Sequence, residues 1–257
     1  MRIRWSVLLL LLPACNGGDG GSALNPVDWP GRDGKLVGLD QALVVEFDHP
    51  LRPGLRTGCF SLLTEGGQEC PPLDFEVVQS QLVLHPRLPR QSDLQDGTLH
   101  AGTRYQLLLR GFPHLAGLTS ADGQALVGDR LIRFETLPAG APEALAGDGT
   151  GGMPLRLALS LQGGVIPVDP DGFMRIPVRH GIDPRSLSHP ARLQRGGRPP
   201  ELVPLSLSEN LPGRALLEVH VGEWSGIATL ELPAELEGLG GRRLLQADRF
   251  LRLRGSG

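Results

Sequence analysis

Three cysteines carry the most distinctive chemistry in this sequence of 257 residues. Cys15 ends the one continuous apolar run of the chain, whereas Cys59 and Cys70 lie in the stretch GCFSLLTEGGQEC. A cysteine thiol can carry a lipid, form a disulfide or bind a metal ion. The residues around each cysteine indicate which of these applies.

The residues before Cys15 have the layout of a secretory signal. Arg2 and Arg4 form a short positive region, and residues 5–12 are apolar with one serine among them. This run is too short to cross a membrane, because a transmembrane helix needs about 20 apolar residues. The tetrapeptide Leu-Pro-Ala-Cys at residues 12–15 resembles the lipobox of bacterial lipoproteins.

The lipobox resemblance implies that Cys15 is the lipidated first residue of the mature protein. Residues 1–14 would then be a signal peptide that is removed, and the Cys15 sulfur would carry a diacylglyceryl group. Each buried methylene contributes about 0.8 kcal/mol, and stable anchoring needs more than one acyl chain. Residues 15–26, rich in glycine at their start, would comprise the lipidated cysteine and a flexible tether. The alternative is a plain secretory signal that ends on a cysteine by coincidence.

Cys59 and Cys70 are predicted to form a disulfide. An exported protein reaches an oxidising compartment, and with Cys15 joined to lipid these two are the only remaining partners. On the chain-entropy model, closing so short a loop stabilises the fold by roughly 3 kcal/mol. The alternative is two separately buried thiols, because the expected turn does not place them directly opposite each other. Zinc-ligand spacing is absent, so no metal or cofactor is expected.

Other residue types that could do chemistry lack the patterns that chemistry needs. His49 and His180 occupy corresponding places in two similar halves of the chain, which fits a shared metal or proton site less well than a polar residue at a strand end. Asp169 and Asp171 resemble the start of a calcium loop, but a Pro-Asp-Gly turn explains them better. Motifs of hydrolases, zinc proteases and nucleotide-binding loops are missing. We therefore expect no catalytic residues and no enzyme activity.

Composition argues against nucleic acid as a partner. Without residues 1–14 the net charge is about −5, and the basic residues are scattered arginines with one lysine, Lys35. The chain contains 36 glycines and 23 prolines, which suits short strands and tight turns better than helices.

Short apolar runs with partial alternation predict an all-β fold of two sandwich domains. One series of runs occupies residues 27–138 and a second occupies residues 153–257, separated by Pro, Gly and Asp. Residues 139–152, AGAPEALAGDGTGG, are small and poor in bulky apolar groups, which predicts a linker between the domains.

The two series are diverged copies of one unit. The first contains Pro113, Gly117, Leu118, Gly123, Leu126, Asp129 and Arg130, and the second contains Pro233, Gly238, Leu239, Gly241, Leu244, Asp248 and Arg249 in the same order. FDHPLRP at residues 47–53 corresponds to VRHGIDP at residues 178–184. The polar excursion RLPRQSDLQDGTLHAG of the first copy has no counterpart in the second.

A family resemblance rests on FDHPL, LHP, LHAGTRYQL, and ADGQAL leading into FET. In this order they resemble bacterial Ig-like domains of the SbsA type, over roughly residues 27–138. The resemblance implies an Ig-like β-sandwich. The second copy lacks the Gly-Thr-x-Tyr step, so it is expected to be a diverged Ig-like domain.

The expected function is that of a lipid-anchored, non-catalytic protein of the bacterial envelope, on the outer membrane, with a structural or spacer role. One alternative is a module that binds an envelope polysaccharide or protein, which a concave patch containing Trp29, Trp224 or Phe112 would favour. Another is an enzyme with an unfamiliar site of converging carboxylates and histidines. The sequence leaves the oligomeric state open.

Overall fold

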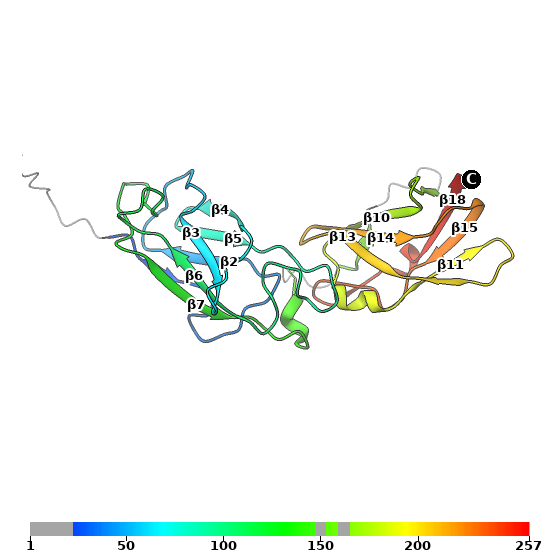
Figure 1. Cartoon of the computed structure of the whole chain (residues 1–257), viewed down its shortest axis with the longest axis horizontal. Coiled ribbons are helices and arrows are strands. Elements are labelled where there is room, and N and C mark those ends of the chain that lie inside the picture. Colours follow the sequence, from blue (N-terminus) through cyan, green and yellow to red (C-terminus); the bar gives the residue numbers. More distant parts are fainter. Residues whose placement is uncertain (1–22, 148–152, 159–164, 257) are drawn as a thin grey trace, which may run out of the picture.

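The computed structural model describes residues 23–147, 153–158 and 165–256. Its regular elements are β-strands, and the helical segments of these residues are three short 3-10 turns, η1 (Pro142–Leu145), η2 (Pro184–Ser188) and η3 (Gln246–Asp248). The predicted all-β fold class is therefore confirmed. Two β-sandwiches lie end to end along the long axis of the molecule, as Figure 1 shows. We call them the first domain (23–147) and the second domain (153–158 and 165–256).

The first domain contains one sheet of four strands and one of three. The first sheet has the order β1 (Pro26–Asp28), β2 (Leu43–Phe47), β5 (Gln81–His85), β4 (Asp74–Val78), and the second has the order β3 (Phe60–Thr64), β6 (Arg104–Leu109), β7 (Arg130–Glu135). All of these strands pair antiparallel. This order is the one found in Ig domains of the constant type.

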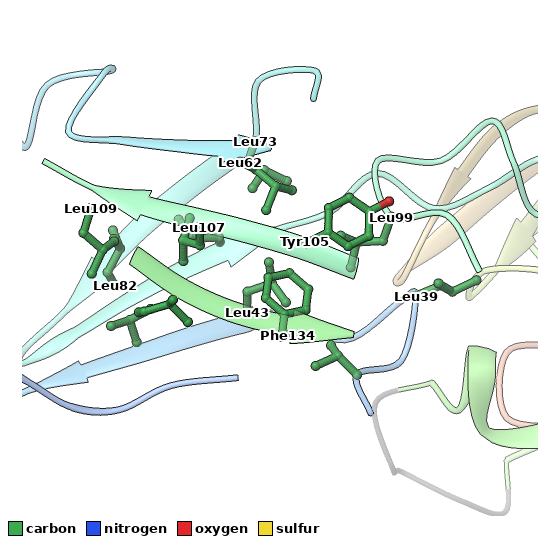
Figure 2. Close-up of a cluster of buried hydrophobic side chains, with 14 of the residues drawn as sticks. Leu39, Leu43, Leu62, Leu73, Leu82, Leu99, Tyr105, Leu107, Leu109 and Phe134 are labelled. Carbon is green, nitrogen blue, oxygen red and sulfur yellow. The ribbon is translucent and has the colours of Figure 1, made fainter. Parts of the chain in front are cut away.

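Alternating apolar residues fill the space between the two sheets of the first domain. Leu43 on β2 and Leu82 on β5 face Tyr105 and Leu107 on β6, and all four are buried (Figure 2). Side chains of a strand point alternately to its two faces, so every second residue reaches this core. Burial of each large apolar side chain stabilises the fold by about 1.5–3 kcal/mol.

The second domain is a full sandwich with two additional strands. One sheet has the order β13 (Leu205–Leu211), β14 (Arg214–His220), β10 (Phe173–Arg179), β8 (Arg156–Leu157), and the other has the order β12 (Glu201–Val203), β11 (Ala191–Arg195), β15 (Ser225–Glu231), β18 (Phe250–Ser256), β9 (Val165–Pro167). A small hairpin joins β16 (Glu237–Gly238) to β17 (Arg242–Arg243). Strand β9 runs parallel to β18, whereas the other strands pair antiparallel. This domain has its own buried cluster around Met174, Ile176 and Leu217.

The strand orders of the two domains are equivalent. Strands β2, β5 and β4 correspond to β10, β14 and β13, and strands β3, β6 and β7 correspond to β11, β15 and β18. Outside the strands, Leu51 pairs with Ser120 just as Ile182 pairs with Gly238. These pairings agree with the alignment of FDHPLRP with VRHGIDP, in which Leu51 corresponds to Ile182. They make Ser120, not Gly117, the equivalent of Gly238, and Leu118 corresponds to Leu236 rather than Leu239, because Leu126 and Leu244 donate to the carbonyl oxygens of Leu118 and Leu236.

Tyr105 fixes the turn that leads into β6. Its hydroxyl oxygen accepts a hydrogen bond from the His100 backbone N–H at 2.6 Å, and its ring stacks on Phe134 with centroids 5.5 Å apart. The Thr136 hydroxyl donates to the His100 carbonyl oxygen at 2.6 Å. A tyrosine that bonds the backbone just upstream of this strand is the tyrosine corner of Ig-like sandwiches. The motif LHAGTRYQL therefore encodes a tyrosine corner. The second domain has no tyrosine corner, because Tyr105 is the only tyrosine of the chain.

Part of the predicted linker 139–152 is packed into the first domain. η1 lies within it, and Ala144 and Leu145 are 0% and 1% exposed in the first domain's core. The small residues of this segment therefore close the end of a sandwich. The remaining residues of the predicted linker, 148–152, lie outside the described residues.

Candidate functional site

The predicted lipidation site cannot be located in the fold, because Cys15 and all residues up to 22 lie outside the described residues. Lipidation of Cys15 stays a prediction. In the part of the chain that the structure describes, no helix has the length and apolarity needed to span a bilayer.

Cys59 and Cys70 are both free thiols in the structure. Cys70 lies opposite Leu62, to whose carbonyl its N–H donates at 2.9 Å, whereas Cys59 precedes Leu62 by three residues. Three extended residues span about 10 Å, and a disulfide needs Cα atoms within about 7 Å of each other. The structure contains no bond between them, because the hairpin turn places the two cysteines out of register, and the disulfide stays a prediction.

The electrostatic surroundings of the two thiols also differ from those of a reactive pair. Burial raises the pKa of Cys59 to about 11. Burial, with a further contribution from the charge of Glu69, raises the pKa of Cys70. Both thiols are consequently poor nucleophiles at neutral pH, because only the thiolate reacts.

His49 and His180 do not come together in one site. His49 lies beside Asp48 at the end of the first domain remote from the second, with Nδ1 3.0 Å from the carboxylate, whereas His180 lies where the two domains meet. Asp169 pairs with Arg175 and accepts a hydrogen bond from Gly172 in a turn. His49, His180 and Asp169 therefore do not come together in one shared site.

Polar and apolar contacts hold the two domains together in a joint. We define the joint by residues 86–90 and 139–147 of the first domain and residues 180–186, 208–213 and 237–242 of the second. It occupies the middle of the molecule in Figure 1. The contacts of the joint form the most extensive arrangement of buried polar side chains in the described residues.

Arg185 connects η2 to the end of the first domain. Its Nη1 donates to the carbonyl oxygens of Ala139 and Ala141 at 2.9 and 3.0 Å. Its Nε and Nη2 bind the carboxylate of Asp183 in a fork, at 3.0 and 2.7 Å. Asp183 is buried and raises the pKa of Arg185 by this pairing. The charged pair therefore orients the guanidinium toward two backbone carbonyls of the other domain.

Asn210 makes a second polar contact across the joint and is only 5% exposed. Its side-chain amide donates to the carbonyl oxygens of Pro89 and Ile182 at 2.8 and 2.9 Å, and its Oδ1 accepts from the Ile182 N–H at 2.9 Å. Beside it, Arg90 donates to the carbonyl oxygen of Ser208 at 3.2 Å. Pro89 and Arg90 belong to the polar excursion of the first copy, which thus reaches the second domain.

Leu239 supplies the apolar part of the joint. It belongs to the second domain but packs in the core cluster of the first. The neighbouring Gly240 N–H donates to the Leu145 carbonyl oxygen at 2.8 Å. Gly181 is needed beneath it, because a Cβ there would lie 2.6 Å from Leu239 Cδ1. Hydrogen bonds and close packing together fix how one domain sits on the other.

A cleft of about 570 Å³ opens beside the joint. Its polar lining residues are Asp40, Gln41, Asp74, His85 and Arg87 from the first domain and His180 and Arg242 from the second. Asp40 accepts a hydrogen bond from the Gly147 N–H, and burial, aided by the charge of Asp183, raises its pKa. His85 is half-exposed and lies 3.4 Å from Glu76. Across the described ranges, no group of three or more His, Cys, Asp or Glu side chains could hold a metal ion.

The aromatic residues that would mark a binding patch lie apart. Trp29 packs against the first core and Trp224 against the second, each with an arginine over its ring, Arg32 at 5.1 Å and Arg195 at 5.4 Å. Phe112 is exposed at the remote end of the first domain. The three aromatic side chains therefore do not form one concave patch.

Comparisons with known proteins give weak similarities. No protein-family model matches the chain, and no curated protein sequence matches it. Among solved structures, native alpha-2-macroglobulin from Escherichia coli, spanning domains MG0-NIE-MG1, has 12% identity and a TM-score of 0.41, covering 92% of this chain and 72% of that one. The N-terminal part of the bacterial S-layer protein SbsC has 12% identity and a TM-score of 0.34, covering 91% and 44%. Chicken CNTN1 domains FN1-FN3 have 8% identity and a TM-score of 0.22, covering 90% and 64%. With TM-scores below 0.5, none of these similarities assigns a function.

Sequence reasoning missed the residues that build the joint. Asp183, Arg185 and Asn210 carry no motif, and their partners are backbone groups in the other domain. The sequence did contain one signal. A polar excursion that occurs in only one of two copies indicates a contact or function that the other copy lacks. The structure shows that Pro89 and Arg90 of this excursion contact the second domain.

Proposed function

We propose that this chain is a lipid-anchored, non-catalytic protein of the bacterial envelope whose two Ig-like domains act as a rigid spacer. The contacts of the joint are the observation that supports the spacer role. Domains in one chain usually move relative to each other unless their interface is extensive and well packed. Here the buried Asn210 and the Asp183–Arg185 pair satisfy backbone groups across the interface, which favours one fixed arrangement.

Export and anchoring belong to the same proposal and are supported by the sequence. Residues 1–14 have the layout of a signal peptide, and Leu-Pro-Ala-Cys at residues 12–15 resembles a lipobox. The proposed location is the outer membrane, on its periplasmic or surface side. Membership of the first domain in the SbsA-type Ig-like family is also proposed, and the tyrosine corner within LHAGTRYQL supports it.

Binding of an envelope polysaccharide or protein is the second candidate function. The cleft beside the joint is the observation that favours it, because ligand sites often lie where domains meet. Its lining combines His85, His180 and Arg87 with apolar residues such as Leu211. Some polar groups of the cleft already stabilise the fold, since Asp40 accepts a hydrogen bond from the Gly147 N–H. We therefore prefer the spacer role.

Small-angle X-ray scattering tests the spacer role. The chain from residue 16 onward, which contains every described residue, should scatter as one elongated particle of fixed shape. Arg185→Ala removes both bonds to the first domain and leaves Asp183 buried without its partner, so it should broaden the interatomic distance distribution. Arg192→Ala, an exposed arginine of the second domain, is the matched control and should leave the distribution unchanged. Scattering from the parent chain that requires many domain arrangements would refute the rigid spacer.

A further inference from the structure

Equivalent ends of the two domains differ in whether another domain covers them. We call the end where the chain enters a domain its leading end, and the opposite end its trailing end. In the second domain the leading end contains Ile182, whose partner is Gly238, and the trailing end of the first domain covers it. In the first domain the leading end contains the equivalent pair, Leu51 and Ser120, and the second domain lies at the opposite end of the sandwich.

This uncovered leading end exposes large apolar side chains. Leu115 is 99% exposed, Phe112 is 67% exposed and Val127 is 62% exposed. Phe112 and Val127 are paired in a β-bridge, so their side chains belong to one surface. Leu115 shares a shallow depression of about 450 Å³ with Arg52 and Arg56. Large exposed apolar side chains at one end of a domain indicate a docking surface.

The charges around these apolar residues favour an anionic partner. Among the carboxylates at this end, Asp129 is occupied by Arg110 at 3.8 Å and by His114 at 3.3 Å, Asp48 lies 3.0 Å from His49, and Asp122 accepts a hydrogen bond from the Ser120 hydroxyl. Arg52 and Arg56 are exposed and form no ion pair among the described residues. The leading end therefore combines protruding apolar side chains with two arginines available for negatively charged groups.

The chain enters the first domain at this same end. Leu24 pairs with Leu126, next to Val127, and its N–H donates to the Ala125 carbonyl oxygen at 3.3 Å. Seven residues, 16–22, lie between Cys15 and Ala23, and the eight Cα–Cα steps from Cys15 to Ala23 span at most about 28 Å when fully extended. A lipid on Cys15 would therefore keep the leading end within that distance of the bilayer.

We propose that the leading end of the first domain docks on the lipid surface. Phe112 and Leu115 enter the boundary between headgroups and acyl chains, while Arg52 and Arg56 contact anionic headgroups. This inference rests on the proposed anchor at Cys15, which supplies the proximity. Docking then orients the first domain on the membrane and directs the second domain away from it.

A second copy of this chain fits the leading end less well. The equivalent surface of the second domain is covered by a trailing end that carries Pro89 and Arg90. The trailing end of the second domain lacks the excursion that supplies these two residues. Head-to-tail stacking of copies would therefore lack the contacts that hold the joint.

Vesicle sedimentation tests the docking without the anchor. The chain from residue 16 onward should bind vesicles of phosphatidylethanolamine with phosphatidylglycerol and should not bind phosphatidylcholine vesicles. Combined Phe112→Ser and Leu115→Ser substitutions should lower binding by about tenfold or more. Arg52→Ser should lower it about fivefold, and so should Arg56→Ser. Combined Leu202→Ser and Ile227→Ser substitutions, at residues each 67% exposed on the second domain, are the matched control and should leave binding unchanged.

Several outcomes would overturn the proposal. One is no binding to the anionic vesicles in large lipid excess, and another is equal loss in the control. A third is that the chain sediments as a dimer, and that the combined Phe112→Ser and Leu115→Ser substitutions convert it to a monomer without altering vesicle binding. This surface would then be an interface between copies of the chain. Unchanged circular dichroism spectra of the variants verify that they are folded. Failure of the anchor is a separate result, because lipid incorporation at Cys15 is measured on the full chain in cells.

Discussion

Tyr105, Asn210 and Arg185 direct their polar atoms at backbone groups that are buried or partly buried in the fold. Buried backbone donors and acceptors are almost always hydrogen-bonded in native proteins, because an unpaired one costs free energy. These three side chains therefore contribute to stability and orientation. They are the residues at which single substitutions should have large effects.

Tyr105→Phe should reduce the free energy of unfolding of the first domain by about 1–3 kcal/mol, because the partly buried His100 N–H loses its acceptor. Tyr105→Leu should cost more, since it also removes the ring that stacks on Phe134. Urea unfolding followed by circular dichroism measures both. An unfolding midpoint for Tyr105→Phe equal to that of the parent chain would show that the tyrosine corner is not used.

The two free thiols should react with iodoacetamide at different stages. Cys70 is partly exposed and should be alkylated in the folded protein, whereas the buried Cys59 should react only after unfolding. Because burial raises the pKa of Cys70, its alkylation should be slower than that of glutathione at neutral pH and should accelerate as the pH rises toward that raised pKa. Mass spectrometry of peptides identifies the modified residue. Two thiols that appear only after reduction would instead establish the Cys59–Cys70 disulfide.

At the scale of elements, the polar excursion and η1 form the surface at the trailing end of the first domain that contacts the second domain. The excursion contributes Pro89 and Arg90, and η1 lies between Ala141 and Gly147, which both contact the second domain. The excursion is also tied to the first core, where Leu88, Leu94 and Leu99 are buried. Its polar contacts to the second domain are therefore made from a rigid base.

Asn210→Ala should weaken this contact. It leaves the Pro89 carbonyl and the Ile182 N–H without their partner, which should cost about 2 kcal/mol. Differential scanning calorimetry should show the two domains unfolding in more clearly separated transitions. Ser206→Ala, an exposed position on the same strand β13, is the control and should leave the trace unchanged. Identical traces for Asn210→Ala and the parent chain would show that the domains are not coupled through this residue.

Local patterns made the strands predictable, whereas long-range pairings were not. Leu43, Val45 and Phe47 alternate in burial as their sequence predicts, and the repeat indicated two similar sandwiches. The joint depends on partners such as Asn210 and Pro89, 121 residues apart, and no local pattern encodes them. Cys59 and Cys70 are free thiols in the structure, which is the alternative that the expected turn already indicated, because a shift along a hairpin changes every opposing pair.

At the scale of the whole molecule, the proposed anchor at Cys15 would determine where the proposed spacer is held. Cys15→Ser should abolish incorporation of labelled fatty acid and release the protein from membranes after a high-salt wash. Docking through the leading end alone should not survive that wash, since salt screens the contacts of Arg52 and Arg56 with anionic headgroups. Label retained by Cys15→Ser would show that lipidation occurs elsewhere or that the lipobox reading is wrong.

The parallel pairing of β9 with β18 has a mechanical consequence. Tension between a membrane anchor at Cys15 and the far end of the second domain would pull β9 toward its start and β18 toward its end. In a parallel pair these forces act along the strands, so the bonds that join residues 165–167 to residues 252–254 are loaded together in shear rather than opened one by one. The second domain is thereby suited to bearing load along the axis on which the two domains are aligned.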